Sequence, residues 1–343
     1  MRLPAVLIRS AAPSLAALLL LLPRISPAVD AAPEGMPLTD PLSEIVIAAP
    51  EPRFVAPTRR DRIGRIWAPV YINEQGPFRL VLDSGANHSG IALRVAEALG
   101  LPLNQQRRVL LRGVTGSTPV ATVNVNSLSA GDIWMGSTDL PIVTDALGGA
   151  DGILGTDKMA DRRVVIDFRH DMISITRSHN ERPTSGFQVI PFRLIHGNLL
   201  AVNATVAGIR TIAIIDTGGQ VTIANPALRS ALEQRRARQK GFPDKIEGVT
   251  TDVQDGDAMA TPPLRIPSTG ESTAVIIRFN EVTYGAMDIF QHWHMMDEPA
   301  MLIGMDALGL LDTLIIDYRR HELQVRMPSG TLNCYEVNAS GLC

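Results

Sequence analysis

Two stretches of the 343-residue sequence carry an aspartate in a setting suited to acid–base chemistry. Residues 78–87 contain an apolar run that ends in Asp83-Ser84-Gly85, and residues 211–220 repeat the pattern with Asp216-Thr217-Gly218. One such triplet arises by chance in roughly one chain in several, and a lone aspartate there is more simply a turn residue. Two copies, each closing an apolar strand, predict a pair of carboxylates brought face to face by a duplicated fold.

Two carboxylates a few ångströms apart have a defined chemistry. They cannot both ionise readily, so the pKa of one rises and the pair shares a proton. Such a pair can hold a water molecule, with one oxygen acting as base while the other donates a hydrogen bond. This arrangement can attack an amide carbonyl without a metal ion or a covalent intermediate, so we expect no cofactor.

Three further landmarks follow each aspartate in the same order, which indicates an internal duplication. Each landmark has its own character: a Gly-Val-Thr turn, an apolar-apolar-Gly strand that leads to an aspartate, and an apolar strand that ends in Asp-aromatic-Arg. The corresponding segments are Gly113-Val114-Thr115 and Gly248-Val249-Thr250, residues 152–157 and 301–306, and residues 164–169 and 314–319.

With these motifs in place, the chain resembles a bacterial member of the pepsin and retropepsin superfamily of aspartic peptidases over about residues 63–326. The resemblance implies a mainly β fold with two homologous β-barrel lobes, short helices and an active-site cleft between the lobes. It also implies that Asp83 and Asp216 are the catalytic dyad, in a single chain that acts as a monomer.

The resemblance assigns supporting roles to the residues around the dyad. Ser84 and Thr217 would hydrogen bond across the lobe interface, and Gly85 and Gly218 would present backbone N–H groups to the carboxylates. Two apolar-apolar-Gly strands would pack beneath the active-site loops, and two hairpin tips would act as flaps that contact substrate. The strand residues are Ile153, Leu154, Gly155, Leu302, Ile303 and Gly304, and the flap residues are Gly113, Val114, Thr115, Gly116, Gly248, Val249 and Thr250. An ordinary hairpin tip is an almost equally good interpretation of each flap.

The sequence departs from pepsins directly after each motif. Pepsins carry a hydroxyl residue after the motif glycine, whereas this chain has Ala86 and Gly219. Losing a hydrogen bond to the charged form should raise the lower pKa of the dyad, which predicts activity at weakly acidic to neutral pH. The flap tyrosine of pepsins is also absent, so its chemistry is not carried over.

The domain organisation follows from these landmarks. We expect a signal peptide over residues 1–28, a Pro- and Ala-rich linker over 29–60, an N-terminal lobe over 61–180, a C-terminal lobe over 187–330 and a tail over 331–343. In the tail, Cys334 and Cys343 could form a disulfide that closes a small loop. Helices are predicted over residues 91–99 and 227–232. Residues 252–273, which are rich in Pro, Gly, Thr and Asp, are predicted to be a surface loop.

Several other polar residues favour structural roles. Asp157 and Asp306 are predicted to cap short helices that follow them, and Asp167 and Asp317 to serve in turns or ion pairs. His292 and His294 would share one face of a strand, but further metal ligands are not evident. We therefore expect no metal site.

Net charge and the N-terminal segment limit the classes of partner that we expect. The net charge of −3 gives no reason to expect nucleic acid. Arg2 and Arg9 precede an apolar run over residues 11–22 and small residues near Ala28, a pattern typical of a secretory signal that leaves no stable membrane span after cleavage. The sequence thus predicts an exported aspartic endopeptidase, periplasmic or secreted, with a peptide or protein substrate. The alternative is a weakly active or inactive pseudo-protease that binds peptides in the same cleft.

Overall fold

Strands dominate the part of the chain that the computed structural model describes, which comprises residues 54–57, 66–144, 148–235, 241–270 and 272–328. The four helices of these residues are short: α1 (Leu93–Ala98), α2 (Pro226–Arg235), α3 (Asp288–His292) and α4 (Met305–Leu308). A mainly β fold is therefore confirmed. The predicted signal peptide, most of the predicted linker and the predicted disulfide between Cys334 and Cys343 lie outside the described residues.

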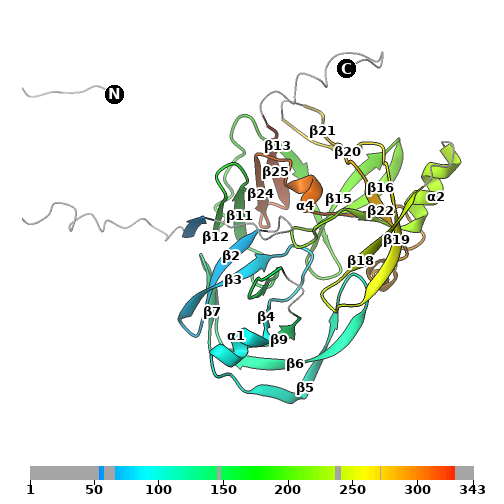
Figure 1. Cartoon of the computed structure of the whole chain (residues 1–343). Helices are drawn as coiled ribbons and strands as arrows, with labels where there is room; N and C mark the ends of the chain where they lie inside the picture. Colours follow the sequence, from blue (N-terminus) through cyan, green and yellow to red (C-terminus); the bar gives the residue numbers. More distant parts are fainter. Residues whose placement is uncertain (1–53, 58–65, 145–147, 236–240, 271, 329–343) are drawn as a thin grey trace, which may run out of the picture. The chain divides into compact units, whose positions relative to one another are not determined.

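A nine-stranded sheet, here called the N-terminal sheet, holds the first Asp-Ser-Gly motif (Figure 1). Its strand order is β5 (Leu103–Arg112), β6 (Ser117–Val125), β9 (Thr138–Val143), β4 (Gly90–Ala92), β10 (Gly152–Leu154), β3 (Gln75–Leu82), β2 (Trp67–Ile72), β7 (Leu128–Ala130) and β8 (Ile133–Met135). Most neighbours are antiparallel, but β10 runs parallel to β3 and β4 runs parallel to β9.

A second sheet, the C-terminal sheet, holds the Asp-Thr-Gly motif and repeats this order strand for strand. Its order is β18 (Phe242–Glu247), β19 (Val253–Met259), β22 (Val282–Tyr284), β17 (Ile223–Ala224), β23 (Ala300–Ile303), β16 (Ile209–Ile215), β15 (Leu199–Val206), β20 (Leu264–Pro267) and β21 (Ala274–Ile277), and β14 (Arg193–Ile195) pairs with β15. The parallel pairs also recur, because β16 runs parallel to β23 and β17 to β22. The sequence duplication is thus a duplication of topology.

A third sheet, the shared sheet, joins the two halves of the chain. Its order is β1 (Phe54–Pro57), β12 (Met172–Arg177), β11 (Arg162–Asp167), β24 (Thr313–Asp317), β25 (Glu322–Arg326) and β13 (Gln188–Pro191). The two halves meet where β11 pairs antiparallel with β24, with Val165 opposite Ile315. These two strands contain the Asp-aromatic-Arg landmarks of the sequence, so corresponding strands of the repeat pair with each other where the two halves meet.

Aliphatic side chains supply the core, as the aromatic content of 4% requires. Strand β2 alternates in burial, with Ala68, Val70 and Ile72 fully buried, which is the pattern of a strand with one face on the core. Strands β23 and β24 are buried along their whole length. A strand covered on both faces reads as a continuous apolar run, and this explains Met301-Leu302-Ile303 and Leu314-Ile315-Ile316.

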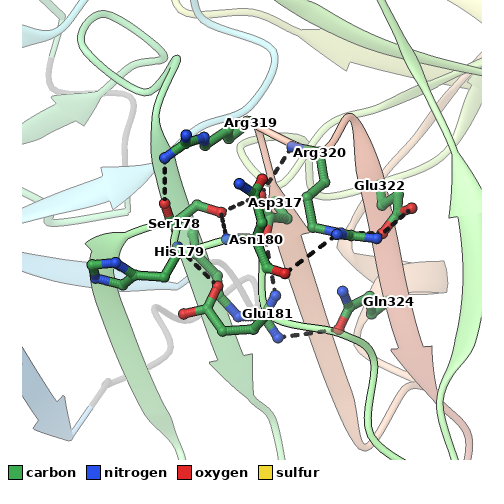
Figure 2. Close-up of polar contacts among 10 residues, drawn as sticks. Ser178, His179, Asn180, Glu181, Asp317, Arg319, Arg320, Glu322 and Gln324 are labelled. Atoms are coloured by element: carbon green, nitrogen blue, oxygen red, sulfur yellow. Dashed lines mark hydrogen bonds and ion pairs between the residues drawn. The ribbon is translucent and has the colours of Figure 1, made fainter. Parts of the chain in front are cut away.

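Asp317 organises a polar network beside the shared sheet (Figure 2). Its fully buried side chain accepts hydrogen bonds from Arg163 Nη1 (3.0 Å), Ser178 Oγ (2.8 Å) and the backbone N–H of Arg320 (3.1 Å). Asp167, at the matching position, accepts from the backbone and ring of His170. Both aspartates therefore have turn and ion-pair contacts, as the sequence indicated. Ser178 directly follows β12, so the Asp317 network ties the connection between the two halves to the shared sheet.

Three local predictions were wrong. Residues 252–273 contain β19 and β20 rather than a loop. Leu264 and Ile266 of β20 are buried, and β20 pairs with β15 and β21. The local composition does not reveal this pairing. Residues 90–92 form β4, so the helix predicted over 91–99 spans only α1. His292 ends helix α3, and no strand contains His294.

Candidate active site

Asp83 and Asp216 occupy matching positions directly after β3 and β16. The backbone N–H of Asp83 donates to Leu154 O, and that of Asp216 donates to Ile303 O, each at 3.0 Å. Each carboxylate then accepts a hydrogen bond from the glycine of its own triplet, Gly85 N to Asp83 Oδ1 at 2.8 Å and Gly218 N to Asp216 Oδ1 at 3.0 Å. The triplets thus fold into tight turns that fix the carboxylates.

The two turns face each other at close range. A Cβ atom added to Gly218 would lie 2.2 Å from Asp83 Cγ, and one added to Gly85 would lie 2.7 Å from Asp216 Oδ1. Each carboxylate therefore rests against the glycine of the opposite triplet, where no larger residue fits. This juxtaposition joins residues from the two halves of the chain into one site.

Ser84 and Thr217 exchange hydrogen bonds between the two turns. Ser84 N donates to Thr217 Oγ1 (3.0 Å) and Thr217 N donates to Ser84 Oγ (3.1 Å). Their hydroxyls also donate across the junction, Ser84 Oγ to Ile215 O (2.8 Å) and Thr217 Oγ1 to Leu82 O (2.7 Å). Both side chains are buried, so these bonds are shielded from water.

The apolar-apolar-Gly strands β10 and β23 lie beneath the two turns. A Cβ on Gly155 would lie 2.5 Å from His88 C, and one on Gly304 would lie 2.6 Å from Val221 C. Glycine at these positions lets the strand backbone approach the loop that follows each aspartate. The preceding residues, Ile153, Leu154, Leu302 and Ile303, are all buried.

Asp157 and Asp306 bind those same loops, and the prediction that they cap following helices was wrong. Asp157 Oδ1 accepts from Ser89 Oγ (2.6 Å), and Asp306 Oδ1 accepts from Thr222 Oγ1 (2.7 Å). Sequence reasoning missed Ser89 and Thr222, although both are hydroxyl residues at the same spacing after their aspartates.

Each of these hydroxyls also accepts the N–H of the strand glycine below it. Gly155 N donates to Ser89 Oγ, and Gly304 N donates to Thr222 Oγ1, both at 3.1 Å. A carboxylate, a hydroxyl and a glycine N–H thus form one chain of hydrogen bonds under each turn. The strands therefore fix the loops that hold the candidate dyad.

Two hairpins meet at their tips (Figure 1, teal and yellow). Residues 113–116 connect β5 to β6, and residues 248–252 connect β18 to β19. Thr115 Oγ1 donates to Asp252 O at 2.7 Å, and a Cβ on Gly248 would lie 2.4 Å from Thr115 Oγ1. A Cβ on Gly113 would likewise lie 3.0 Å from Val249 Cγ1. The glycines allow the tips to interlock.

Each hairpin tip is held by the opposite half of the chain. Val114 packs against a C-terminal cluster that includes Phe290, and its carbonyl accepts from Ile289 N at 3.2 Å. Val249 packs against an N-terminal cluster that includes Val81 and Ile153, and its carbonyl accepts from Thr144 Oγ1 at 2.5 Å. Ala86, three residues after Asp83, packs against that N-terminal cluster too.

The comparisons with known proteins bear on the first of the two halves. Residues 68–157 match the aspartyl protease family model. The match runs from β2 to Asp157 and thus contains the first Asp-Ser-Gly triplet, the first hairpin and Gly155. It supports an aspartyl protease-type function and, at that coarse level, a peptidase activity. No curated protein matches the chain.

The aspartyl protease match does not include the second triplet, Asp216-Thr217-Gly218. Asp216 lies outside residues 68–157, yet it is 7% exposed and lies against Gly85 of the matched region. The C-terminal sheet therefore brings Asp216 into contact with the first triplet.

Tyr318 lies buried within electrostatic reach of Asp83. Burial raises the pKa of the Tyr318 hydroxyl far above its ordinary value, and the negative charge of Asp83 raises it further. The raised pKa keeps the hydroxyl neutral around neutral pH, so Tyr318 adds no negative charge beside Asp83.

Neither a metal site nor a membrane-spanning helix is found in the part of the chain that the structure describes. No three His, Cys, Asp or Glu residues in the described ranges are grouped so as to hold a metal ion. Burial lowers the pKa of His292, and so do the charges of Arg112, His196 and His294. Among the same residues, no helix is long and apolar enough to cross a bilayer.

Proposed function

We propose that the chain is an exported, single-chain aspartic endopeptidase with two lobes, in which Asp83 and Asp216 activate the attacking water. The observation that carries this proposal is the interlocking of the two triplets, in which each carboxylate lies against the glycine of the other. The N-terminal and C-terminal sheets would be the cores of the two lobes, and the shared sheet would join them. The predicted signal peptide over residues 1–28 supports export.

The proposed mechanism uses only these two side chains and water. One carboxylate is protonated and the other is ionised, because two anions at such short range repel each other. The ionised oxygen accepts a proton from the bound water as it attacks the scissile carbonyl, and the protonated oxygen donates to the developing oxyanion. A proton then passes to the leaving nitrogen as the C–N bond breaks, which regenerates the shared-proton dyad.

The remaining residues would position this chemistry. The hydrogen bonds between Ser84 and Thr217 hold the two turns in register, and the N–H groups of Gly85 and Gly218 orient the carboxylates. A bound peptide would lie as an extended strand between the dyad and the hairpin tips, held by main-chain hydrogen bonds. Because the tips interlock in this structure, substrate entry would require them to separate.

The test is hydrolysis of a mixed peptide library by wild type and by the Asp83→Asn and Asp216→Asn variants. Each substitution keeps the size of the side chain but removes the base or the shared proton, so each should abolish cleavage. Asp161→Asn is the matched control, because its carboxylate is 49% exposed and forms surface ion pairs that contribute little. Cleavage that survives either dyad substitution would refute the assignment. Peptide binding without any cleavage by wild type would indicate a pseudo-protease.

A further inference from the structure

An exposed row of three side chains crosses one end of the N-terminal sheet, where β2 and β7 lie side by side (Figure 1). Tyr71 of β2 lies opposite Ser129 of β7, and Ser129 lies opposite Trp134 of β8. The next residues along two of these strands, Ile72 and Leu128, are buried, so the row lies on the face that points away from the core. Trp134 is 69% exposed, the highest value among the large apolar side chains that the structure describes, and Tyr71 is 39% exposed.

The indole of Trp134 lies against Gly136, two residues further along the chain. A Cβ atom added to Gly136 would lie 3.3 Å from Cη2 and 3.6 Å from Cζ3 of the indole. Gly136 does not have a positive φ, so its backbone conformation does not require glycine. The absent side chain instead leaves room for the indole, and most of the ring surface stays open to solvent. Trp134 is thus available to stack against a ligand.

The spacing of the two aromatic side chains matches the repeat of a sugar polymer. One strand lies between Tyr71 and Trp134, so the two residues are about 9.5 Å apart across the sheet. Alternate rings of a β-1,4-linked glycan present the same face, and one disaccharide unit of such a chain has a similar length. The C–H groups on the face of a sugar ring pack well on the negative face of an aromatic ring. Ser129, between the two, carries a hydroxyl that can donate to or accept from sugar hydroxyls.

The polar groups near the row favour a neutral ligand. Arg79 of β3, on the same face of the sheet, already forms an ion pair with Asp151 at 3.8 Å. Close to Trp134 in the chain, Ser137 Oγ donates to Asn124 Oδ1 at 3.3 Å, and Asn124 Nδ2 donates to Asp139 Oδ1 at 2.9 Å. Hydroxyl, amide and carboxylate groups all bind sugar hydroxyls. An anionic polymer or an anionic membrane would instead need an excess of positive charge, and the net charge of the chain is −3.

The row is also narrow, which favours a linear ligand over a second copy of the chain. A stable protein interface buries about 800 Å² on each partner and involves about 20–30 residues a side. The other exposed large apolar side chains of the N-terminal half belong to α1 and β5. Strands β5 and β8 stand at opposite ends of the strand order of the N-terminal sheet, so these side chains do not extend the row.

We propose that Tyr71 and Trp134 bind a neutral β-1,4-linked glycan, with alternate sugar rings stacked on the two side chains and the hydroxyl of Ser129 bonded to the sugar between them. This site goes beyond the proposed peptidase function, and neither proposal depends on the other. In an exported protein, such a site would hold the chain on a polysaccharide.

The test is isothermal titration calorimetry of the full chain with cellohexaose and with chitohexaose, two β-1,4-linked hexasaccharides. Wild type should bind at least one of them, and it should bind the corresponding monosaccharide more weakly, because one sugar covers only one aromatic ring. Trp134→Ala and Tyr71→Ala should each weaken the Kd about twofold to tenfold. Trp134→Phe and Tyr71→Phe keep a ring and should lose less.

The matched control is Phe242→Ala, which removes a side chain that is 65% exposed in β18 of the C-terminal sheet. This variant should bind the hexasaccharide with the Kd of wild type. Thermal unfolding monitored by circular dichroism should give Trp134→Ala and Phe242→Ala the Tm of wild type, because both changes are on the surface. A weaker Kd in Trp134→Ala then reports a lost contact with the glycan.

Four results would overturn the glycan site. The first is that wild type shows no saturable binding of either hexasaccharide, and the second is that Trp134→Ala binds as tightly as Phe242→Ala. The third is equal affinity for maltohexaose, since its α-1,4 linkages curve the chain and alternate rings no longer share a face. The fourth is self-association of wild type in sedimentation velocity that Trp134→Ala abolishes, which would assign the row to a contact between copies. The peptidase proposal is decided separately, by the Asp83→Asn and Asp216→Asn variants.

Discussion

Ser84 and Thr217 each use a backbone N–H and a hydroxyl to bind the other, at 3.0 Å and 3.1 Å, across the junction of the two halves of the chain. Their hydroxyls then donate to the last residues of the opposite strands, Ile215 and Leu82. Because Asp83 and Asp216 directly precede these two residues, the separation of the carboxylates depends on these bonds. The same hydrogen bonds therefore contribute to the stability of the fold and to the geometry of the proposed dyad.

Thr217→Val tests this coupling. The substitution leaves Ser84 N without its acceptor and Leu82 O without its donor in a fully buried position, and it should lower the free energy of unfolding by about 2–3 kcal/mol. Denaturant unfolding monitored by circular dichroism measures the change. Thr217→Ser keeps the hydroxyl and should lose less than half as much. A Thr217→Val protein within 0.5 kcal/mol of wild type, roughly the scatter of surface substitutions, would contradict the coupling.

Gly218→Ala tests the contact between the two triplets. The new Cβ would lie 2.2 Å from Asp83 Cγ, so the carboxylate must move. A displacement of about an ångström at the reacting groups should lower kcat/KM on the order of a hundredfold. The control is Gly136→Ala, whose Cβ would lie 3.3 Å from Trp134, a side chain that is 69% exposed and free to adjust. Equal activity in the two variants would show that the carboxylate does not need this position.

Much of the fold and of the candidate site could be predicted from the sequence, because the information is local and occurs twice. Asp83 and Asp216 end apolar strands, and the Gly-Val-Thr turns and the apolar-apolar-Gly strands recur in the same order. A repeat of this kind predicts a duplicated topology without any knowledge of side-chain contacts, and the strand orders of the N-terminal and C-terminal sheets agree with it.

The remaining features join residues that are distant in sequence, so no local pattern reports them. Thr115 contacts Asp252, and Thr144 contacts Val249, yet each of these segments alone resembles an ordinary turn. Asp157 lies in a turn and Asp306 in the first turn of α4, so a helix cap is the natural local interpretation. Their hydroxyl partners, Ser89 and Thr222, lie far back in the chain. Likewise, the Pro- and Gly-rich composition of residues 252–273 predicts a loop, although β19 and β20 in this segment are stabilised by pairing with neighbouring strands.

Asp317→Ala should be among the most damaging substitutions outside the dyad. It would leave the Arg163 guanidinium, which is 13% exposed, without its carboxylate, and Ser178 Oγ without its acceptor. Removing one member of a buried ion pair costs about 3–5 kcal/mol. The control is Arg319→Ala, which removes one bond to Ser178 O (Figure 2) and should cost about 1 kcal/mol. Denaturant unfolding of both variants compares them, and equal losses would argue against a central role for Asp317.

Asp167 should make stability depend on pH. Burial alone opposes its ionisation, but the ring and the backbone N–H of His170 outweigh it and lower the pKa of Asp167. A lowered folded-state pKa stabilises the protein above the unfolded value of about 3.9, and this stabilisation disappears as the pH falls through the folded value. The difference in Tm between wild type and Asp167→Asn should therefore be largest near pH 5 and shrink towards about pH 2. A difference that stays constant with pH would exclude this linkage.

The pH–rate profile tests the departure from pepsins at Ala86. Without a hydroxyl after the motif glycine, the ionised form of the dyad has one fewer donor, so wild type should be most active at weakly acidic to neutral pH and not near about pH 2. Ala86→Ser supplies a donor one residue beyond Gly85 and should move the acid limb of kcat/KM to lower pH. A serine at Gly219 is a poor choice for this test, because its Cβ would lie 2.8 Å from Asp216 Oδ2. An acid limb that stays in place in Ala86→Ser would mean that other groups set the pH range of the dyad.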